Sequence, residues 1–213
     1  MDFLDPNLSS YAEAHTSPES EVLALLNRET HAKILMPRML SGHLQGRVLS
    51  MLSHMIRPKQ ILEIGTYTGY SALCLAEGLQ ANGVLHTIDI NDELSSMVDA
   101  YIQKASLQTK IKTYYGNALE IIPTLDLLFD LVFIDADKIN YSKYFDLVID
   151  KIPSGGFILT DNVLWSGKIL DDPAKMDSDT KAIHAFNQKI QNDNRVENVL
   201  LPVRDGIMLI RKK

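Results

Sequence analysis

Short apolar runs alternate with helix-like stretches through most of this chain, and that alternation limits the folds it can adopt. Five runs have the length and residue types of buried strands: QILEIG (60–65), VLHTIDI (84–90), IKTYYG (111–116), LVFIDA (131–136) and GFILTDN (156–162). Helix-like stretches separate them, at residues 70–81, 92–106, 117–123 and 140–151. Strands that alternate with helices in this way form a parallel sheet with helices on both faces. The sequence therefore predicts an α/β fold built on a doubly wound, mostly parallel sheet.

The remaining segments complete the same unit. A helix is predicted to begin near Ser17, with Pro18 in its first turn, and MPRMLSGHLQGRVLSMLSHMI carries apolar residues at helical spacing. Residues 163–180 read as a long loop, which a helix near 178–193 follows. VENVLLPV and GIMLIRKK then form a hairpin about Arg204 and its neighbours Asp205 and Gly206. We predict one domain over 1–213, with an N-terminal helical segment (1–57) packed on it.

The composition excludes several classes of protein. A net charge of −6 and a pI near 5.5 argue against a protein that binds nucleic-acid backbones. No apolar stretch approaches the roughly 20 residues that span a bilayer, and MDFLDPNLSS lacks the features of a secretory signal. The single cysteine, Cys74, excludes an internal disulfide and suits a reducing compartment. We expect a cytoplasmic protein that does not bind membranes.

The first glycine turn, in LEIGTYTGYSAL, indicates a nucleoside site. In open α/β sheets ligands bind beyond the carboxyl ends of the strands, and Gly65 and Gly69 allow the backbone to approach one. Tyr67 stands where a dinucleotide site needs its second glycine, which argues against NAD or FAD. Glu63 could accept from an ammonium group, and Asp89 lies at the interval typical of a ribose-binding carboxylate. These residues favour S-adenosylmethionine (SAM); the alternative is that the glycines only turn the chain.

A second polar cluster follows two later strands. Asp135 and Asp161 end strands that are predicted to be neighbours, and Asn162 adds an amide oxygen. Oxygen ligands of this kind suit Mg²⁺, Ca²⁺ or Mn²⁺, whereas zinc prefers histidine or cysteine. The alternative is that each aspartate caps the element that follows it. The three together, with Lys138 beside them, predict a site for a divalent cation, most simply Mg²⁺.

These motifs, taken in order, resemble a known enzyme family. LEIGTYTGYS, IDI, GNALEIIPTL, FDLVFIDADKINY and LTDNVLWSGK are similar to segments of the cation-dependent O-methyltransferases of the caffeoyl-CoA and catechol type. The resemblance covers the chain from MLSGHLQGR to DGIMLIRKK. It implies a seven-stranded Rossmann-like methyltransferase sheet with an antiparallel C-terminal hairpin. Members of the family are commonly homodimers, so a homodimer is expected here.

The resemblance also implies roles for individual residues. Asp135, Asp161 and Asn162 match the metal ligands, and Lys138 matches the catalytic lysine, with Asp135 beside it as the second residue assigned to catalysis. The positions expected to hold SAM are Met39, Ser41, Glu63, Gly65, Tyr67, Gly69, Ser71, Asp89, Ala118 and Asp135. The acceptor-binding elements match less well, so Trp165 and Tyr141 are expected to wall the acceptor pocket or to anchor a loop, and Arg204 to face the acceptor or solvent.

The chemistry of the predicted reaction explains these residue types. A phenol has a pKa near 10 and is a poor nucleophile at neutral pH. A divalent cation bound by two vicinal hydroxyls favours the phenolate and orients it. Lys138 lies three residues beyond Asp135, where it can act as a general base or stabilise the phenolate. We therefore predict methyl transfer from SAM to a hydroxyl of a catechol-like small molecule.

Three other functions are compatible with parts of the sequence. The first is methylation of a hydroxylated base in tRNA, for which basic residues could supply a local face: Lys33, Arg38, Arg47, Arg57 and Lys59. The second is a nicotinamide-dependent oxidoreductase, which the missing glycine argues against. The third is a non-catalytic binding domain, which the intact polar cluster argues against.

Overall fold

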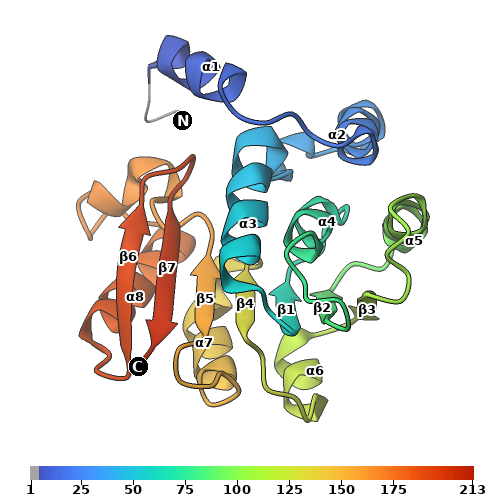
Figure 1. The fold of residues 1–213 in the computed structure, drawn as a ribbon. Helices are drawn as coiled ribbons and strands as arrows, with labels where there is room; N and C mark the ends of the chain where they lie inside the picture. The colour runs from blue at the N-terminus through green and yellow to red at the C-terminus, as the bar shows by residue number, and fades with distance from the viewer. Residues whose placement is uncertain (1–4) are drawn as a thin grey trace.

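A single sheet of seven strands organises the molecule (Figure 1). The computed structural model describes residues 5–213; residues 1–4, part of the predicted domain 1–213 and of segment 1–57, lie outside the described residues. The strands are Gln60–Ile64 (β1), Val84–Asp89 (β2), Ile111–Tyr115 (β3), Leu131–Ile134 (β4), Phe157–Thr160 (β5), Val196–Leu201 (β6) and Ile207–Lys212 (β7). Their order is β3-β2-β1-β4-β5-β7-β6, in which β7 runs antiparallel to both its neighbours and the other pairs are parallel. The predicted fold class is confirmed.

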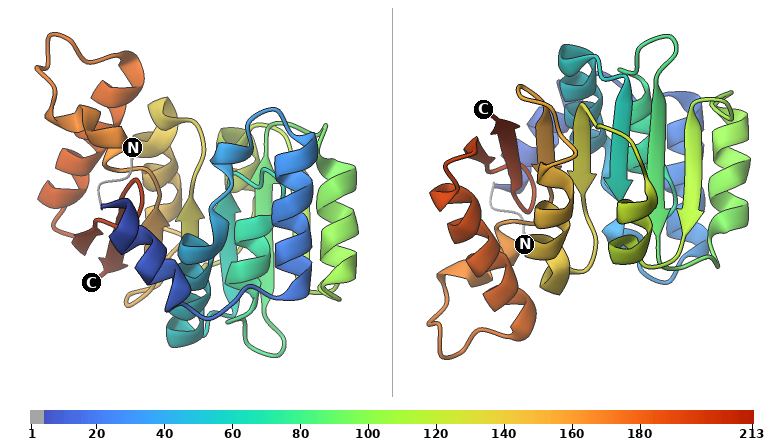
Figure 2. Two further views of the ribbon diagram at one scale, coloured as in Figure 1. Left: turned by 90° about the horizontal axis from the view of Figure 1, so that it is seen from above. Right: turned by 90° about the horizontal axis from the view of Figure 1, so that it is seen from below.

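Helices cover both faces of the sheet, as the views from above and below show (Figure 2). The α-helices are Pro6–Ala14 (α1), Glu21–Lys33 (α2), Gly42–Ile56 (α3), Tyr70–Ala76 (α4), Ser95–Lys104 (α5), Ala118–Thr124 (α6), Tyr141–Ile149 (α7) and Ser178–Asn192 (α8). The described part of the chain also contains three short 3-10 helices, Pro37–Met39 (η1), Lys138–Asn140 (η2) and Trp165–Leu170 (η3). Among residues 5–213, no helix is long and apolar enough to cross a membrane.

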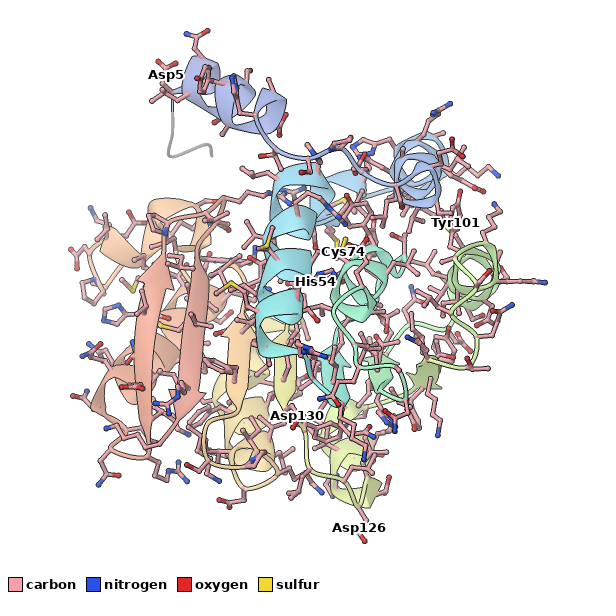
Figure 3. The ribbon with its side chains drawn as sticks, in the orientation of Figure 1. Asp5, His54, Cys74, Tyr101, Asp126 and Asp130 are labelled. Atoms are coloured by element: carbon pink, nitrogen blue, oxygen red, sulfur yellow. The ribbon has the colours of Figure 1, made fainter. Side chains whose placement is uncertain are left out.

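The core consists of two apolar layers that the sheet separates. On one face, α6, α7 and α8 pack on the sheet through residues such as Ile122, Phe145 and Phe186. On the other, α2 to α5 pack through residues such as Leu26 and Leu49. Strands with helices on both faces are apolar on both faces, which is why these strands read as continuous apolar runs. Cys74 is fully buried in the second layer between α3 and α4, as a small core residue (Figure 3).

Several helix ends differ from the sequence prediction. The helix expected from Ser17 begins at Glu21, because the Ser20 hydroxyl accepts from the Leu23 N–H at 3.3 Å and so caps it. α4 ends at Ala76 rather than near residue 81, where Gly78 passes so close to α3 that an added Cβ would lie 2.2 Å from the Ser53 carbonyl carbon. A backbone contact of this kind cannot be recognised from the spacing of apolar residues in the sequence.

The segments before and after the alternating strands and helices can also be compared with the sequence prediction. α1 lies within the segment 1–57 that was predicted to be helical, although no separate helix was predicted there; it has no buried residue and lies at the outside of the molecule (Figure 1). The predicted long loop 163–180 contains η3, and α8 begins at Ser178 with Asp177 as its N-cap. The β6–β7 hairpin is as predicted, with Arg204 and Gly206 at positive φ in its turn.

Candidate active site

The residues that the sequence singled out lie in a row at the carboxyl edge of the sheet. The last residues of β2, β1, β4 and β5 are set side by side by the register, which pairs Ile64 with both Ile88 and Ile134 and pairs Ile134 with Thr160. Gly65, Asp89, Asp135 and Asp161 end or directly follow these strands. Asp126 and Asp130, labelled in Figure 3, lie at the opposite edge, before β4. The parallel topology thus brings together two motifs that are about 70 residues apart.

Asp89 fixes the first glycine turn. Its Oδ2 accepts from the backbone N–H groups of Thr66 and Tyr67, at 2.9 and 2.7 Å. The Tyr67 hydroxyl donates to the carbonyl of Met36 at 2.9 Å, which ties η1 to the turn. Tyr67 itself has φ +51° and Gly69 has φ +86°. Asp89 therefore shapes the backbone of the turn at the same time as it presents a carboxylate at the edge of the sheet.

Gly65 lies against the backbone of the cation motif, the group formed by Asp135, Lys138, Asp161 and Asn162. Its φ is +103°, and a Cβ added there would lie 1.9 Å from the Asp135 carbonyl oxygen. Van der Waals contact between carbon and oxygen requires well over 3 Å, so no side chain fits. The glycine is therefore needed for the close approach of β1 to β4 as well as for its dihedral angle.

The Gly65→Ala change is expected to lower the free energy of unfolding by about 3 kcal/mol or more, since steric overlap adds to left-handed strain. Gly155 is the matched control, with φ +85° and no atom within 4 Å of an added Cβ. Gly155→Ala should cost only the strain of a left-handed alanine, about 1 kcal/mol. Urea unfolding of both variants measures the difference; equal losses would show that the contact with Asp135 has no energetic weight.

Glu63 is fully buried beside the turn, and only one of its two carboxylate oxygens has a hydrogen-bond partner. Its Oε2 accepts from the Thr87 hydroxyl at 2.5 Å, whereas Oε1 has no hydrogen-bond partner. Burial, together with the negative charges of Asp135 and Asp89, raises the pKa of Glu63 to about 8, although the hydrogen bond from Thr87 opposes this shift. A buried acceptor without a partner is costly unless a ligand completes it.

The other residues expected to hold SAM come from separate segments of the chain. Ser71 lies buried in α4, and Ala118 is the buried first residue of α6 after β3. Ser41 is buried directly before α3 and makes no capping hydrogen bond there. Met39 ends η1 and is 57 % exposed. They come from four different elements at the same edge of the sheet.

Lys138 joins the two halves of the cation motif. Its Nζ donates to Asp135 Oδ1 at 3.1 Å, to Asn162 Oδ1 at 2.7 Å and to the Tyr141 hydroxyl at 2.7 Å. The side chain is 9 % exposed, and its Nζ lies 5.6 Å from the centre of the Trp165 ring. An ammonium has three donors, and here all three are used. Two of the predicted metal ligands thus converge on one positive charge.

Asp161, the third predicted ligand, is 4 % exposed and does not contact Lys138 Nζ. Its Oδ2 accepts from Gln45 Nε2 at 2.7 Å, and its Oδ1 accepts from the Asn162 N–H at 2.8 Å. Burial and the negative charge of Asp135 raise the pKa of Asp161 above its ordinary range, and the hydrogen bond from Gln45 opposes this. Two carboxylates close enough to repel each other are stabilised by a cation between them.

Residues 12–213 match the O-methyltransferase family. The chain belongs to this family. A caffeoyl-CoA O-methyltransferase of Mesembryanthemum crystallinum is 40% identical over 185 residues, which cover 79% of this chain and 70% of that protein. The O-methyltransferase of Bacillus cereus in complex with S-adenosylhomocysteine has a TM-score of 0.89 at 27% identity, with 97% of each chain covered. The SAM complex of a Streptomyces achromogenes O-methyltransferase involved in tomaymycin synthesis gives 0.88 at 26% identity, covering 97% and 96%.

Membership confirms the resemblance and the prediction of an O-methyltransferase, and it excludes the oxidoreductase. Within this O-methyltransferase the structure corrects one expectation. Tyr141 has no exposed surface and cannot wall an acceptor pocket; its hydroxyl accepts from Lys138 and donates to the Asp161 carbonyl at 3.0 Å. Trp165 is partly buried against the core, which fits the anchoring role considered for it, and its ring lies next to Lys138 Nζ.

Three residues of the methyltransferase were missed or left open by the sequence. Gln45 is a polar residue at a buried position of α3, and only that burial could have drawn attention to it. Arg204 is an exposed residue of the hairpin turn, which agrees with the solvent-facing alternative, and its guanidinium also donates to Leu40 O and Gln45 Oε1. Asp137 turns away from the site and accepts from Tyr144 and Asn140.

Neither of two surface hollows of the methyltransferase includes these residues. A hollow of about 370 Å³ lies between α2 and α5, and one of about 520 Å³ lies at the amino edge beside Asp130. Among residues 5–213, no three His, Cys, Asp or Glu side chains are arranged to hold a metal. The candidate cation site has two carboxylates and depends on the Asn162 amide for its third oxygen.

Proposed function

We propose that this O-methyltransferase transfers the methyl group of SAM to one hydroxyl of a catechol-like small molecule, with a divalent cation held by Asp135, Asp161 and Asn162. The observation that carries the proposal is the convergence of Asp135 Oδ1 and Asn162 Oδ1 on Lys138 Nζ, directly beside the first glycine turn. A methyl donor and an ionised acceptor must meet within about 3 Å, and two adjacent binding motifs satisfy that need.

The residues of the first turn fit SAM. The unpartnered Oε1 of Glu63 suits the ammonium group of the cofactor, whose positive charge would favour the ionised carboxylate. Asp89 at the end of β2 suits the ribose hydroxyls. The bound S-adenosylhomocysteine and SAM of the two related structures support the same assignment. Met39, Ser41, Gly65, Tyr67, Gly69, Ser71 and Ala118 would complete this site.

The donor set also fits a hard cation. All three ligands are oxygens, and the ammonium of Lys138 already occupies a position that two of them share. A bound Mg²⁺, Ca²⁺ or Mn²⁺ would supply Lewis acidity and favour the phenolate form of a vicinal diol. The amine and the cation would compete for Asp135 Oδ1 and Asn162 Oδ1. Tyr141, which holds Lys138 Nζ at 2.7 Å, keeps the amine at the site when those oxygens are taken.

Lys138 would then act on the acceptor oxygen. A phenolate requires a positive or proton-accepting group nearby, and the Lys138 amine is the buried side chain of this kind beside the cation motif. The Trp165 ring, 5.6 Å from Nζ, would pack on the aromatic acceptor or shield the amine from water. The acceptor in the name of the Mesembryanthemum crystallinum relative is caffeoyl-CoA, a thioester that contains a vicinal diol.

The alternative of tRNA methylation is weakened by the placement of the basic residues. Lys33 pairs with Glu29 at 2.8 Å, and Arg47 pairs with Glu77 at 2.9 Å. Arg38 lies in η1 before α3 and Arg57 follows α3, so a helix of 15 residues, about 22 Å long, lies between them in the chain. These residues therefore do not form one basic face of the kind that binds a phosphate backbone.

A methyl-transfer screen with isotopically labelled SAM tests the proposal. Catechol, caffeoyl-CoA and other vicinal diols should be methylated in Mg²⁺ and not in excess EDTA. Resorcinol, an isomer of catechol whose hydroxyls are not adjacent, is the matched control and should react at least about 100-fold more slowly. Equal rates with the two isomers, or preferential labelling of total tRNA, would contradict the proposed acceptor class.

A further inference from the structure

The turn of the β6–β7 hairpin reaches across to the start of α3. Arg204 lies in that turn at φ +49°, a left-handed conformation that a side chain disfavours. Its Nη1 donates to the Leu40 carbonyl at 3.1 Å and to Gln45 Oε1 at 3.2 Å. A strained residue whose side chain makes two long-range hydrogen bonds has a positional role.

Gln45 connects Arg204 to the candidate cation site. It is 1 % exposed, and its Nε2 donates to Asp161 Oδ2 at 2.7 Å. A guanidinium can only donate hydrogen bonds, so the Gln45 oxygen must face Arg204 and the amino group must face Asp161. Arg204 thereby fixes the orientation of the Gln45 amide, so that its amino group faces Asp161. With the opposite orientation, two oxygens would face each other in a buried site.

The same turn fixes the backbone that follows Asp161. Leu164 N–H donates to Asp205 O at 2.9 Å, and Val163 N–H donates to Gly206 O at 3.2 Å. The Ser166 N–H donates to the side chain of Asp205. The hairpin turn thus holds the Asp161 side chain through Gln45 and the segment after Asn162 through its main chain.

We propose that Arg204 and Gln45 are positioning residues for the cation site, and that Arg204 acts on Asp161 through Gln45. The inference rests on the proposed function, because it assigns Asp161 as a cation ligand. The hydrogen bond from Gln45 holds one carboxylate oxygen in place, so that less reorganisation accompanies cation binding. Mutation of a residue that hydrogen-bonds to a metal ligand commonly lowers metal affinity by about 10- to 100-fold.

Mn²⁺ binding to the whole protein, followed by electron paramagnetic resonance without SAM or acceptor, tests the inference apart from activity. The variants are Gln45→Met, Arg204→Met and the double variant. Gln45→Met should weaken Mn²⁺ binding by about 10-fold or more, and Arg204→Met by no more than Gln45→Met does. Because Arg204 acts through Gln45, the double variant should bind Mn²⁺ as Gln45→Met does. Affinity for SAM, measured calorimetrically, should not change in Gln45→Met.

Two further variants separate positioning from stability. Arg47→Met removes a guanidinium that pairs with Glu77 from α3, away from Asp161, and should lower Tm without changing Mn²⁺ affinity. Arg204→Gly removes the guanidinium and also the left-handed strain, so its Tm should exceed that of Arg204→Met while Mn²⁺ affinity falls equally.

The outcomes distinguish the inference from the proposed function. If the wild type binds Mn²⁺ and Gln45→Met binds it equally well, the positioning role is wrong while the cation site stands. If losses in the double variant add up, Arg204 does not act through Gln45. If the wild type shows no saturable Mn²⁺ binding, the cation site is wrong and the inference falls with it.

Discussion

Asp161→Ala is expected to abolish cation-stimulated methyl transfer, with a loss in rate of about 100-fold or more, while SAM binding stays nearly intact. Asp161 belongs to the cation motif and contacts Gln45 and Asn162 rather than the first glycine turn. The negative charge of Asp135 raises the pKa of this buried carboxylate, and a bound cation would offset the repulsion between the two. Initial rates against Mg²⁺ concentration, with SAM affinity measured separately, test this expectation.

Asp137→Ala is the matched control for this change. Asp137 is an aspartate two residues from Asp135, but its carboxylate accepts from Tyr144 and Asn140 and faces away from the site. It should lower stability slightly and leave the Mg²⁺ dependence unchanged. The cation role of Asp161 would be refuted by an Asp161→Ala protein that methylates catechol at the wild-type rate in excess EDTA.

Lys138→Met is expected to lower the rate of methyl transfer by about 10²- to 10⁴-fold, the range typical of a lost proton-transfer group. The thioether keeps the length of the side chain and removes the charge that would stabilise the phenolate. Since the amine competes for Asp135 Oδ1 and Asn162 Oδ1, Lys138→Met should bind Mn²⁺ at least as tightly as the wild type. Single-turnover rates at saturating Mg²⁺ measure the chemical step.

Lys143→Met serves as the control, because Lys143 is an exposed lysine of α7 that contacts Asn140 outside the cation motif. Its rate should equal that of the wild type. A Lys138→Met protein that has lost Mn²⁺ binding, rather than the chemical step, would assign Lys138 to the structure of the cation site instead of to the reaction.

Much of the fold could be predicted because its signals are local. The central parallel strands β1, β4 and β5 are buried on both faces, so each leaves an apolar run that can be read without knowledge of its neighbours. The helix ends were less predictable because tertiary contacts decide them. The close approach of Gly78 to α3 ends α4, and of two serines near the start of α2, only Ser20 has its hydroxyl on the Leu23 N–H.

The candidate site likewise contains some residues that could be predicted from the sequence and others that could not. Asp135 and Asp161 could be expected side by side because the carboxyl ends of adjacent parallel strands meet at one edge. Gln45 could not be expected there, since it reaches Asp161 across 116 positions of the sequence. Tyr141 misled the prediction because its aromatic side chain, which suits a pocket wall, points inward to the Lys138 amine and the Asp161 carbonyl.

The contact between Gly65 and the Asp135 carbonyl has a consequence for how such enzymes diversify. In the proposed reaction, main chain alone would separate the turn that binds SAM from the backbone after β4 at this point, because Gly65 has no side chain. The distance from methyl donor to acceptor would then be set by the fold. Different acceptors would be accommodated by substitution at exposed positions of η3, such as Leu170, without a change in that distance.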